Sequence, residues 1–187
     1  MKPGVSDDRH TDVARKRPAW TMRPGGRAPR GRCPRSTLVL GVLVLAAVVS
    51  TRWVRLNLSP SVPVGVYRLA RLAPPLARDT LVLLPVPVAV RPWYRAWAPL
   101  LKPVAAVAGD EVCVQERTLW VAGTSYGPVY EEAHGRPLPH MLDGCSVVQE
   151  GEVFLASPVV GSLDSRYYSF VRITDLTAQA IPLLTWH

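Results

Sequence analysis

Lysine is almost missing from most of this chain. Of the twelve basic side chains that follow residue 35, eleven are arginine, and Lys102 is the single lysine. Arginine keeps its proton at any physiological pH, whereas a desolvated lysine can lose its proton and act as a base. A stray surface lysine is the alternative, so Lys102 becomes a candidate base only together with its neighbours.

An excess of positive charge is also missing from the same part of the chain. Residues 36–187 carry twelve basic and eleven acidic side chains, and the overall charge of +8 comes mainly from residues 1–35, with ten basic and three acidic side chains. Binding to nucleic acid needs clustered positive charge on the folded part of a protein. We therefore expect no nucleic acid as a partner.

Histidine is scarce, and its placement argues against two kinds of site. Of the four histidines, His10 lies in the basic arm and His187 is the last residue. His134 and His140 lie in a stretch rich in glycine and proline, without the spacing or partner ligands of a zinc site. We expect neither a Ser-His-Asp triad nor a metal, and no cofactor is implied.

Apolar side chains are few in residues 1–35, which are rich in proline, glycine and arginine and are expected to form a disordered basic arm. The next segment has no charge before Arg52, and Trp53 follows at the position of an interface residue. We expect a single transmembrane helix over residues 36–54; a cleaved signal peptide is the alternative. Both place residues 55–187 on the periplasmic side of the inner membrane, and the helix would contact the lipid bilayer with the arm in the cytoplasm.

Helical periodicity is nearly absent from residues 55–187, where short apolar runs alternate with proline and glycine. Nine prolines between positions 60 and 103 confine strands to edges or short pieces, so we expect one mostly β domain with a coiled, partly open structure. Residues 122–144 are expected to form a loop or β-extension, and Trp93–Leu100 the one helical turn. The expected strands are Val64–Leu69, Thr80–Pro85, Leu101–Val107, Glu111–Gln115, Thr118–Val121, Gly151–Ala156 and Phe170–Ile173.

Cysteine is rare, with three in the chain. Cys33 lies in the basic arm, which leaves Cys113 and Cys145 in the exported domain. An oxidising compartment would permit a disulfide between them, and two free buried thiols are the alternative.

Two segments hold residues that can carry catalytic chemistry. In the first, Ser59 and Ser61 lie in a proline-stiffened turn that can fix a hydroxyl and expose backbone N–H groups to an oxyanion; an ordinary Ser/Pro linker is the alternative. In the second, Lys102 opens an apolar strand, and desolvation there should lower its pKa. A fall from about 10.4 to about 7 needs about 4–5 kcal/mol of destabilisation of the charged form.

A third segment, Gly161–Tyr168, can support such a site. Ser162 can orient a neighbouring amine through its hydroxyl, and Asp164 and Arg166 can pair to brace the loop. Taken alone, the segment is a capped turn.

In this order, the three segments resemble the type I signal peptidase family of Ser/Lys proteases, and more closely its conjugative-transfer branch, the TraF-type pilin-processing peptidases. The matching runs are S-x-S-V-P-x-G-x-Y, L-L-K-x-V-A-A-V-x-G-D and S-L-D-S-R-Y-Y, within residues 38–173. The chain departs from the family pattern at Pro103, at Arg78-Asp79, where Gly-Asp is usual, and at Ser169. These positions concern loop geometry more than the chemistry.

The resemblance implies a role for each candidate residue. It implies that Ser61 is the nucleophile, Lys102 the general base and Ser59 an oxyanion-hole hydroxyl. The remaining roles are Ser162 as the hydroxyl that holds the lysine amine, Asp164 and Arg166 as structural supports, and Cys113 and Cys145 as a disulfide.

The expected function is that of a membrane-anchored serine endopeptidase. By resemblance, its substrate is an exported, pilin-like precursor from which a leader is removed, with either a linear or a cyclised product. Ser61 lies about 10 residues past the anchor and an extended chain covers at most about 3.6 Å per residue, so we expect the cut close to the membrane. Three alternatives stay open: a general signal peptidase, a catalytically silent β-domain that serves assembly of a secretion channel, and a soluble self-cleaving regulator with the same dyad.

Overall fold

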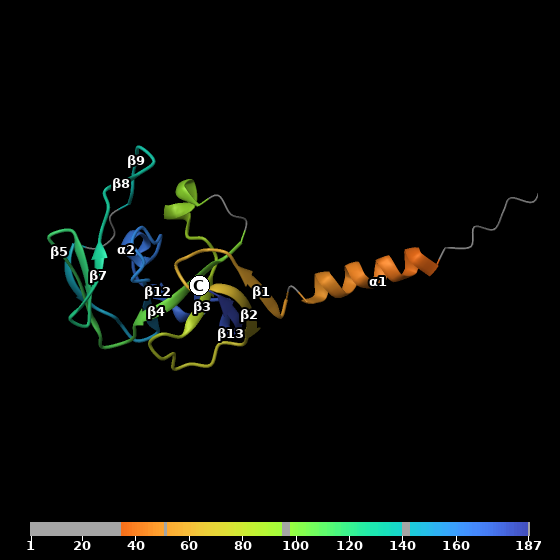
Figure 1. Cartoon of the computed structure of the whole chain (residues 1–187). Coiled ribbons are helices and arrows are strands. Elements are labelled where there is room, and N and C mark those ends of the chain that lie inside the picture. Colours follow the sequence, from red (N-terminus) through yellow and green to blue (C-terminus); the bar gives the residue numbers. More distant parts are fainter. Residues whose placement is uncertain (1–34, 51, 95–97, 140–142, 187) are drawn as a thin grey trace, which may run out of the picture.

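The computed structural model describes residues 35–50, 52–94, 98–139 and 143–186. Within these ranges the chain forms one long helix, three short helices, two larger sheets and a small hairpin (Figure 1). The predicted disorder of the basic arm lies outside the described residues, apart from Arg35, which begins the helix.

The apolar segment forms helix α1, Arg35–Ser50, with 16 residues. The predicted helix over residues 36–54 was therefore too long, because Val54 already pairs with Arg68 in strand β1. At Val54 the backbone is extended because it pairs with β2, so the helix cannot continue to this residue. Of the helices in the part of the chain that the structure describes, none has the length and apolar content needed to cross a membrane.

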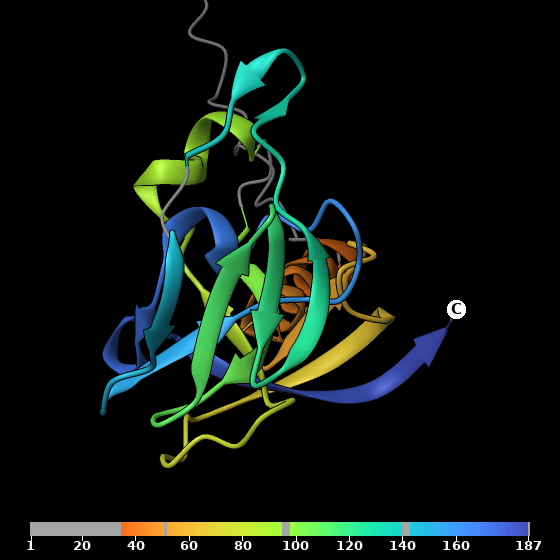
Figure 2. The same ribbon diagram turned by 90° about the vertical axis from the view of Figure 1, so that its left-hand side faces the viewer.

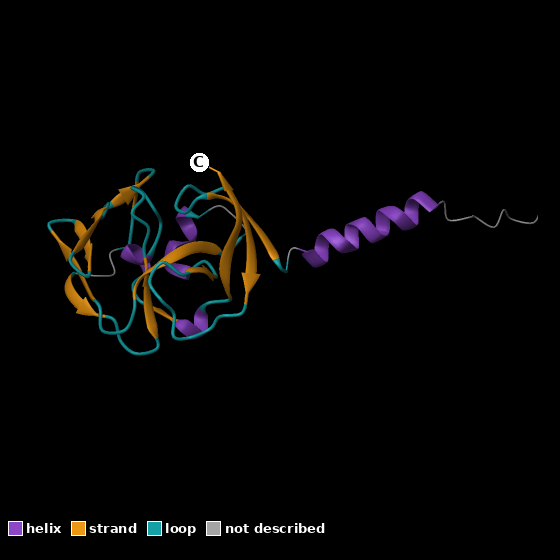
Figure 3. Ribbon diagram, turned by 60° about the horizontal axis from the view of Figure 1, so that its bottom comes forward, coloured by secondary structure: helices purple, strands orange, loops and turns teal. Residues whose placement is uncertain are grey.

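The larger sheet holds seven antiparallel strands and curls into an open half-barrel (Figure 3). Buried side chains such as Val82, Val104 and Phe154 fill its inner face and form the main core. In spatial order the strands are β1 (Val54–Asn57), β2 (Val64–Ala70), β13 (Ala178–Trp186), β3 (Leu81–Leu84), β4 (Leu100–Ala106), β11 (Glu152–Leu155) and β12 (Val171–Arg172).

The smaller sheet has four strands and covers one end of the half-barrel (Figure 2). Cys113 and Cys145 lie directly opposite each other on neighbouring strands, and their sulfur atoms form a disulfide with an S–S distance of 2.06 Å. The strands are β10 (Gly144–Val147), β5 (Glu111–Gln115), β6 (Thr118–Val121) and β7 (Thr124–Pro128).

The region predicted as a loop or β-extension, residues 122–144, contains both kinds of structure. Strand β7 lies within it, and a short hairpin of β8 (Glu132–Ala133) and β9 (Arg136–Pro137) projects beyond the smaller sheet (Figure 2). Residues 140–142 lie outside the described ranges.

Helical turns occur elsewhere than predicted. Trp93 ends the 3-10 helix η1 (Val88–Trp93), Tyr94 is extended and Leu100 begins β4, so the turn predicted over Trp93–Leu100 is wrong at Tyr94 and at Leu100. Residues 95–97 of that prediction lie outside the described ranges. Proline disfavours helix at the residue before it, and Pro99 sets the extended approach to β4. The other short helices are α2 (Ser165–Tyr168) and η2 (Ile173–Asp175).

One close approach between strands brings the elements of the site together. Gly65 on β2 lies against β13, where an added Cβ would stand 2.2 Å from the carbonyl oxygen of Leu184. Strand β13 pairs in turn with β3, and Val82 of β3 is the register partner of Lys102 on β4. The sheet thus connects the serine-bearing turn before β2 to the lysine-bearing strand.

Candidate active site

The turn after β1 is closed by the side chain of Asn57. Its amide nitrogen donates to the carbonyl oxygens of Ser59 (2.8 Å), Val62 (3.3 Å) and Pro63 (3.2 Å), and its Oδ1 accepts from the Ser59 backbone N–H (3.2 Å). An Asx residue that binds the backbone two residues on is a known way to shape a turn. The conformation of the serine turn therefore depends on Asn57 as well as on its prolines.

Ser61 is buried within this turn. Its hydroxyl lies 3.0 Å from that of Ser59, and its carbonyl oxygen accepts a hydrogen bond of 2.6 Å from the hydroxyl of Ser157. Ser157 is fully buried two residues after the end of β11, so the bond fixes the Ser61 backbone against the larger sheet. The backbone of Ser61 is thus held by Ser157, and its hydroxyl is bonded to the hydroxyl of Ser59.

Lys102 lies on β4 and is 4 % exposed. Its Nζ donates to the Ser162 hydroxyl at 2.7 Å. Burial lowers the pKa of Lys102 from 10.5 to about 8; the charge of Asp164 opposes this fall, and that of Arg166 adds to it. A substantial neutral fraction near physiological pH is what a general base requires.

Asp164 and Arg166 form a fully buried ion pair behind the loop that carries Ser162. The Arg166 Nε donates to Asp164 at 2.8 Å, and its Nη atoms donate to the carbonyl oxygens of Pro128 (2.9 Å) and Ser157 (3.0 Å). Asp164 also accepts from the Ser157 backbone N–H at 3.1 Å. These bonds close the loop between Ser157 and Asp164 and so set the position of the hydroxyl that holds Lys102.

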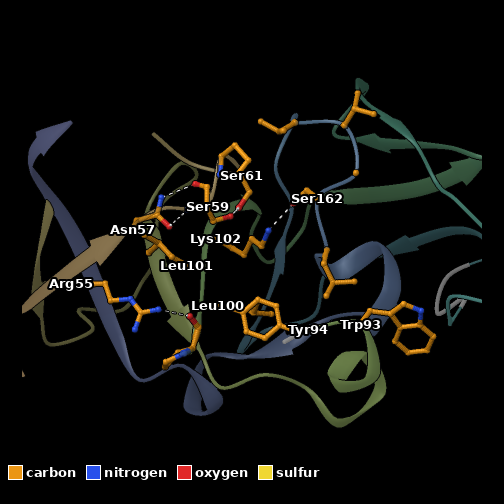
Figure 4. A pocket seen from close by; sticks show the side chains of 16 residues that line it. Arg55, Asn57, Ser59, Ser61, Trp93, Tyr94, Leu100, Leu101, Lys102 and Ser162 are labelled. Carbon is orange, nitrogen blue, oxygen red and sulfur yellow. Dashed lines mark hydrogen bonds between the residues drawn. The ribbon is translucent and has the colours of Figure 1, made fainter. Parts of the chain in front are cut away.

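The two halves of the site meet in a cleft of about 270 Å³ (Figure 4). Ser59, Ser61, Lys102 and Ser162 all line it, as three separate sequence segments predicted. Among the hydrogen bonds of the described residues, none joins Ser61 directly to Lys102: the Ser61 hydroxyl is bonded to that of Ser59, and the lysine amine is bonded to Ser162. Proton transfer between them would need the Ser61 hydroxyl within hydrogen-bond reach of the lysine amine.

The other predicted residues lie outside the cleft lining. Asp164 and Arg166 lie behind it, and Cys113 and Cys145 lie in the smaller sheet. Within the described ranges, Glu111 and these two cysteines form the one group of three close metal-ligand atoms, but the sulfurs are bonded to each other and are not thiolates. This group therefore does not suit a metal.

Two residues that shape the site were not predicted from the sequence. Asn57 could have been found as an Asx residue two positions before Ser59. Ser157 had no local signal, since it acts on Ser61, 96 residues away in the chain.

Comparisons with known proteins identify the family of the chain. The family model described as "Signal peptidase, peptidase S26" matches residues 34–185. The "Conjugal transfer protein TraF" of Agrobacterium tumefaciens is 33% identical over 75% of this chain and 88% of its own length. The "Probable conjugal transfer protein TraF" of Sinorhizobium fredii is 32% identical over 74% of this chain and 82% of its own length.

A solved structure is also similar. The signal peptidase I of Enterococcus faecalis V583 is 21% identical and matches 59% of this chain and 98% of its own, with a TM-score of 0.36, a likeness too weak to define the fold. The family match covers most of the chain, and the relatives match over most of their length. The chain therefore belongs to the signal peptidase family and is close to the conjugal transfer proteins TraF.

Proposed function

We propose that this protein is a serine endopeptidase in which Ser61 is the nucleophile and Lys102 the general base. The observation that carries the proposal is the buried amine of Lys102, whose pKa is lowered to about 8, in the same cleft as the buried hydroxyl of Ser61. Serine needs a base to become a nucleophile, and the cleft offers one basic amine held by Ser162.

The reaction begins when the neutral Nζ of Lys102 takes the proton of the Ser61 hydroxyl. The Ser61 oxygen attacks the scissile carbonyl, and the Ser59 hydroxyl together with backbone N–H groups stabilises the oxyanion. The protonated lysine then gives its proton to the leaving amine, which leaves an acyl-enzyme. Lys102 next activates a water molecule, or admits an amine of the substrate, and the ester breaks to give a linear or a cyclised product.

The proposed substrate is an exported, pilin-like precursor of a conjugative transfer system, from which a leader peptide is removed. Membership of the signal peptidase family supports the removal of a leader, and the names of the two TraF relatives support a role in conjugation.

We also propose that the domain works at the periplasmic face of the inner membrane, with the apolar segment that forms α1 as its anchor. Large apolar side chains are exposed on the strands next to α1. An exposed apolar patch marks an interaction surface, and a patch beside the proposed anchor would face the bilayer. On β1 and the residues beside it these are Trp53, Val54, Leu56 and Leu58, and on β13 they are Leu183, Leu184 and Trp186. Figure 1 shows α1 leading towards β1, with β2 and β13 beside it.

The test is cleavage of a co-expressed pilin-type precursor, with product masses read by mass spectrometry. Wild type should cut, whereas Ser61→Ala and Lys102→Arg should not, because Lys102→Arg keeps a positive charge and removes the base. Ser125→Ala, an exposed serine on β7, is the matched control and should cut like wild type. A product lighter than the linear form by one water would identify cyclisation.

Other results would contradict parts of the proposal. Cleavage by Lys102→Arg at the wild-type rate would exclude Lys102 as the base. Conjugation that survives both substitutions would instead favour a catalytically silent domain. Equal cleavage of unrelated exported precursors would identify a general signal peptidase, and a wholly soluble cytoplasmic protein on fractionation would rule out the anchor.

A further inference from the structure

The cleft contains a charged residue that the proposed reaction does not use. Arg55 lies on β1 two residues before Asn57, and side chains two apart on a strand share a face. The burial pattern agrees, since Arg55 is half-buried and Asn57 buried, whereas Val54 and Leu56 are exposed. The strand that leads into the serine turn therefore also carries Arg55 into the cleft (Figure 4).

The guanidinium of Arg55 is held in place but not neutralised. One nitrogen donates to the carbonyl oxygen of Pro99 at 3.1 Å, which fixes the group against the segment leading into β4. Among the interactions of the described residues, this is the one hydrogen bond of the side chain, and no carboxylate pairs with it. A guanidinium has five N–H donors in a fork that matches a carboxylate, so most of its donors remain for a ligand.

The surroundings of Arg55 favour an anion. The described residues that line the cleft include two basic side chains, Arg55 and Lys102, and no aspartate or glutamate. The cleft lining also includes the apolar side chains of Leu100 and Leu101. Burial raises the pKa of the nearby Tyr94 phenol, and the charge of Arg55 opposes that rise. A half-buried cation next to apolar side chains gains more from an anionic partner than a fully solvated one does.

We propose that Arg55 is a specificity residue that binds a carboxylate of the substrate during cleavage. The proposal rests on the peptidase function above and names the substrate class. The carboxylate belongs either to an Asp or Glu side chain or to a free chain terminus. It lies within a few residues of the scissile bond, because an extended chain rises about 3.3 Å per residue and Arg55 is two residues from the amide that shapes the nucleophile turn.

The test is kcat/KM for matched peptides cleaved by the full-length protein. One set has Glu or Gln at each of the three positions on either side of the scissile bond, and a second set ends at these positions as a free acid or an amide. We expect wild type to cleave the carboxylate member about ten-fold faster at one position, and the ratio to fall to about one in Arg55→Gln. The first set identifies a side-chain carboxylate and the second a chain terminus.

The ratio of kcat/KM between the carboxylate peptide and its neutral partner reports recognition of the carboxylate. General damage to the cleft would slow cleavage of both peptides and leave this ratio unchanged. Arg68→Gln, an exposed arginine on β2, is the matched control and should keep the wild-type ratio. Arg55→Lys should keep part of the preference through its charge, and Arg55→Glu should reverse it towards a peptide with lysine at that position. A wild-type ratio near one at every position, or an unchanged ratio in Arg55→Gln, would overturn the proposal.

Peptide binding to Ser61→Ala tests Arg55 independently of cleavage. If wild type cleaves none of the peptides, the peptidase proposal fails, but fluorescence anisotropy still reports their affinities. Ser61→Ala should bind the carboxylate peptide about ten-fold more tightly than the neutral one. Loss of this preference in the double variant with Ser61→Ala and Arg55→Gln would support the subsite. Equal affinities would overturn it.

Discussion

Replacing Lys102 by methionine removes an amine from a position that is 4 % exposed and leaves an unbranched apolar side chain in its place. The folded protein holds the pKa of this amine at about 8, against an ordinary value of 10.5. That difference corresponds to about 3 kcal/mol by which the charged amine destabilises the folded state at neutral pH. The substitution also leaves the Ser162 hydroxyl without its partner, at a cost of about 1 kcal/mol that does not depend on pH.

The sign of the pH effect follows from proton binding. Below about pH 8 both folded and unfolded wild type carry the proton on Lys102, and the full cost of burying the charge is present. Between about pH 8 and 10.5 the unfolded chain binds more protons than the folded one, so the stability of wild type rises with pH. Relative to Lys102→Met, wild type should therefore gain about 3 kcal/mol across this window.

Urea unfolding of the full-length protein in a non-ionic detergent, measured from pH 7 to pH 11, gives this difference. The other titrating groups are common to both proteins and cancel in the difference between their free energies of unfolding. A difference that stays constant with pH would refute a lowered lysine pKa. It would also remove the main physical support for Lys102 as the base.

Three further predictions concern the reaction and the framework. Cleavage by wild type should rise about ten-fold per pH unit below about pH 8 and level off above it, in a pH profile of kcat/KM, because the neutral form of Lys102 is the active one. Arg166→Met should lower the free energy of unfolding in urea by about 3–5 kcal/mol, since it leaves Asp164 buried without its partner. Gly65→Ala should lower the free energy of unfolding by about 1–3 kcal/mol and reduce Tm, because its Cβ would collide with the Leu184 carbonyl oxygen.

Each of these predictions has a result that would contradict it. A flat pH profile through pH 8 would separate activity from lysine ionisation. Arg166→Met with wild-type stability would mean that water reaches the Asp164 carboxylate. Gly65→Ala with an unchanged Tm would show that β2 and β13 can separate without cost, and Gly123→Ala, at a turn with no atom near its Cβ position, measures the effect of a strained turn alone.

The strands that the sequence predicted share strong local signals. All seven predicted segments contain strands, because each is a run of β-branched or apolar residues between glycine or proline. Strand β13 was missed, since it contains Pro182 and its outer half is exposed. Its conformation is set by pairing with β2 and β3, which lie far away in the chain, and such tertiary effects override local propensity.

The candidate site was predicted where chemistry and local sequence coincide. Ser61, Lys102 and Ser162 could be assigned to one site because each lies in a recognisable motif, and all three line the cleft. The contact of Ser157 with Ser61 could not be predicted, because it depends on how β11 meets the serine turn. The role of Arg55 could not be predicted either, because the sequence does not show which face of a short strand lines the cleft.

The place of β13 in the sheet has a consequence for the order of events during synthesis. This strand lies between β2, which follows the serine turn, and β3, which pairs with the lysine-bearing β4. It is also made after every other strand of the sheet. A growing chain therefore carries both candidate catalytic residues long before the strand that joins their supports exists. Under the proposed function, cleavage would therefore begin only after residues 178–186 have been made and have paired with β2 and β3.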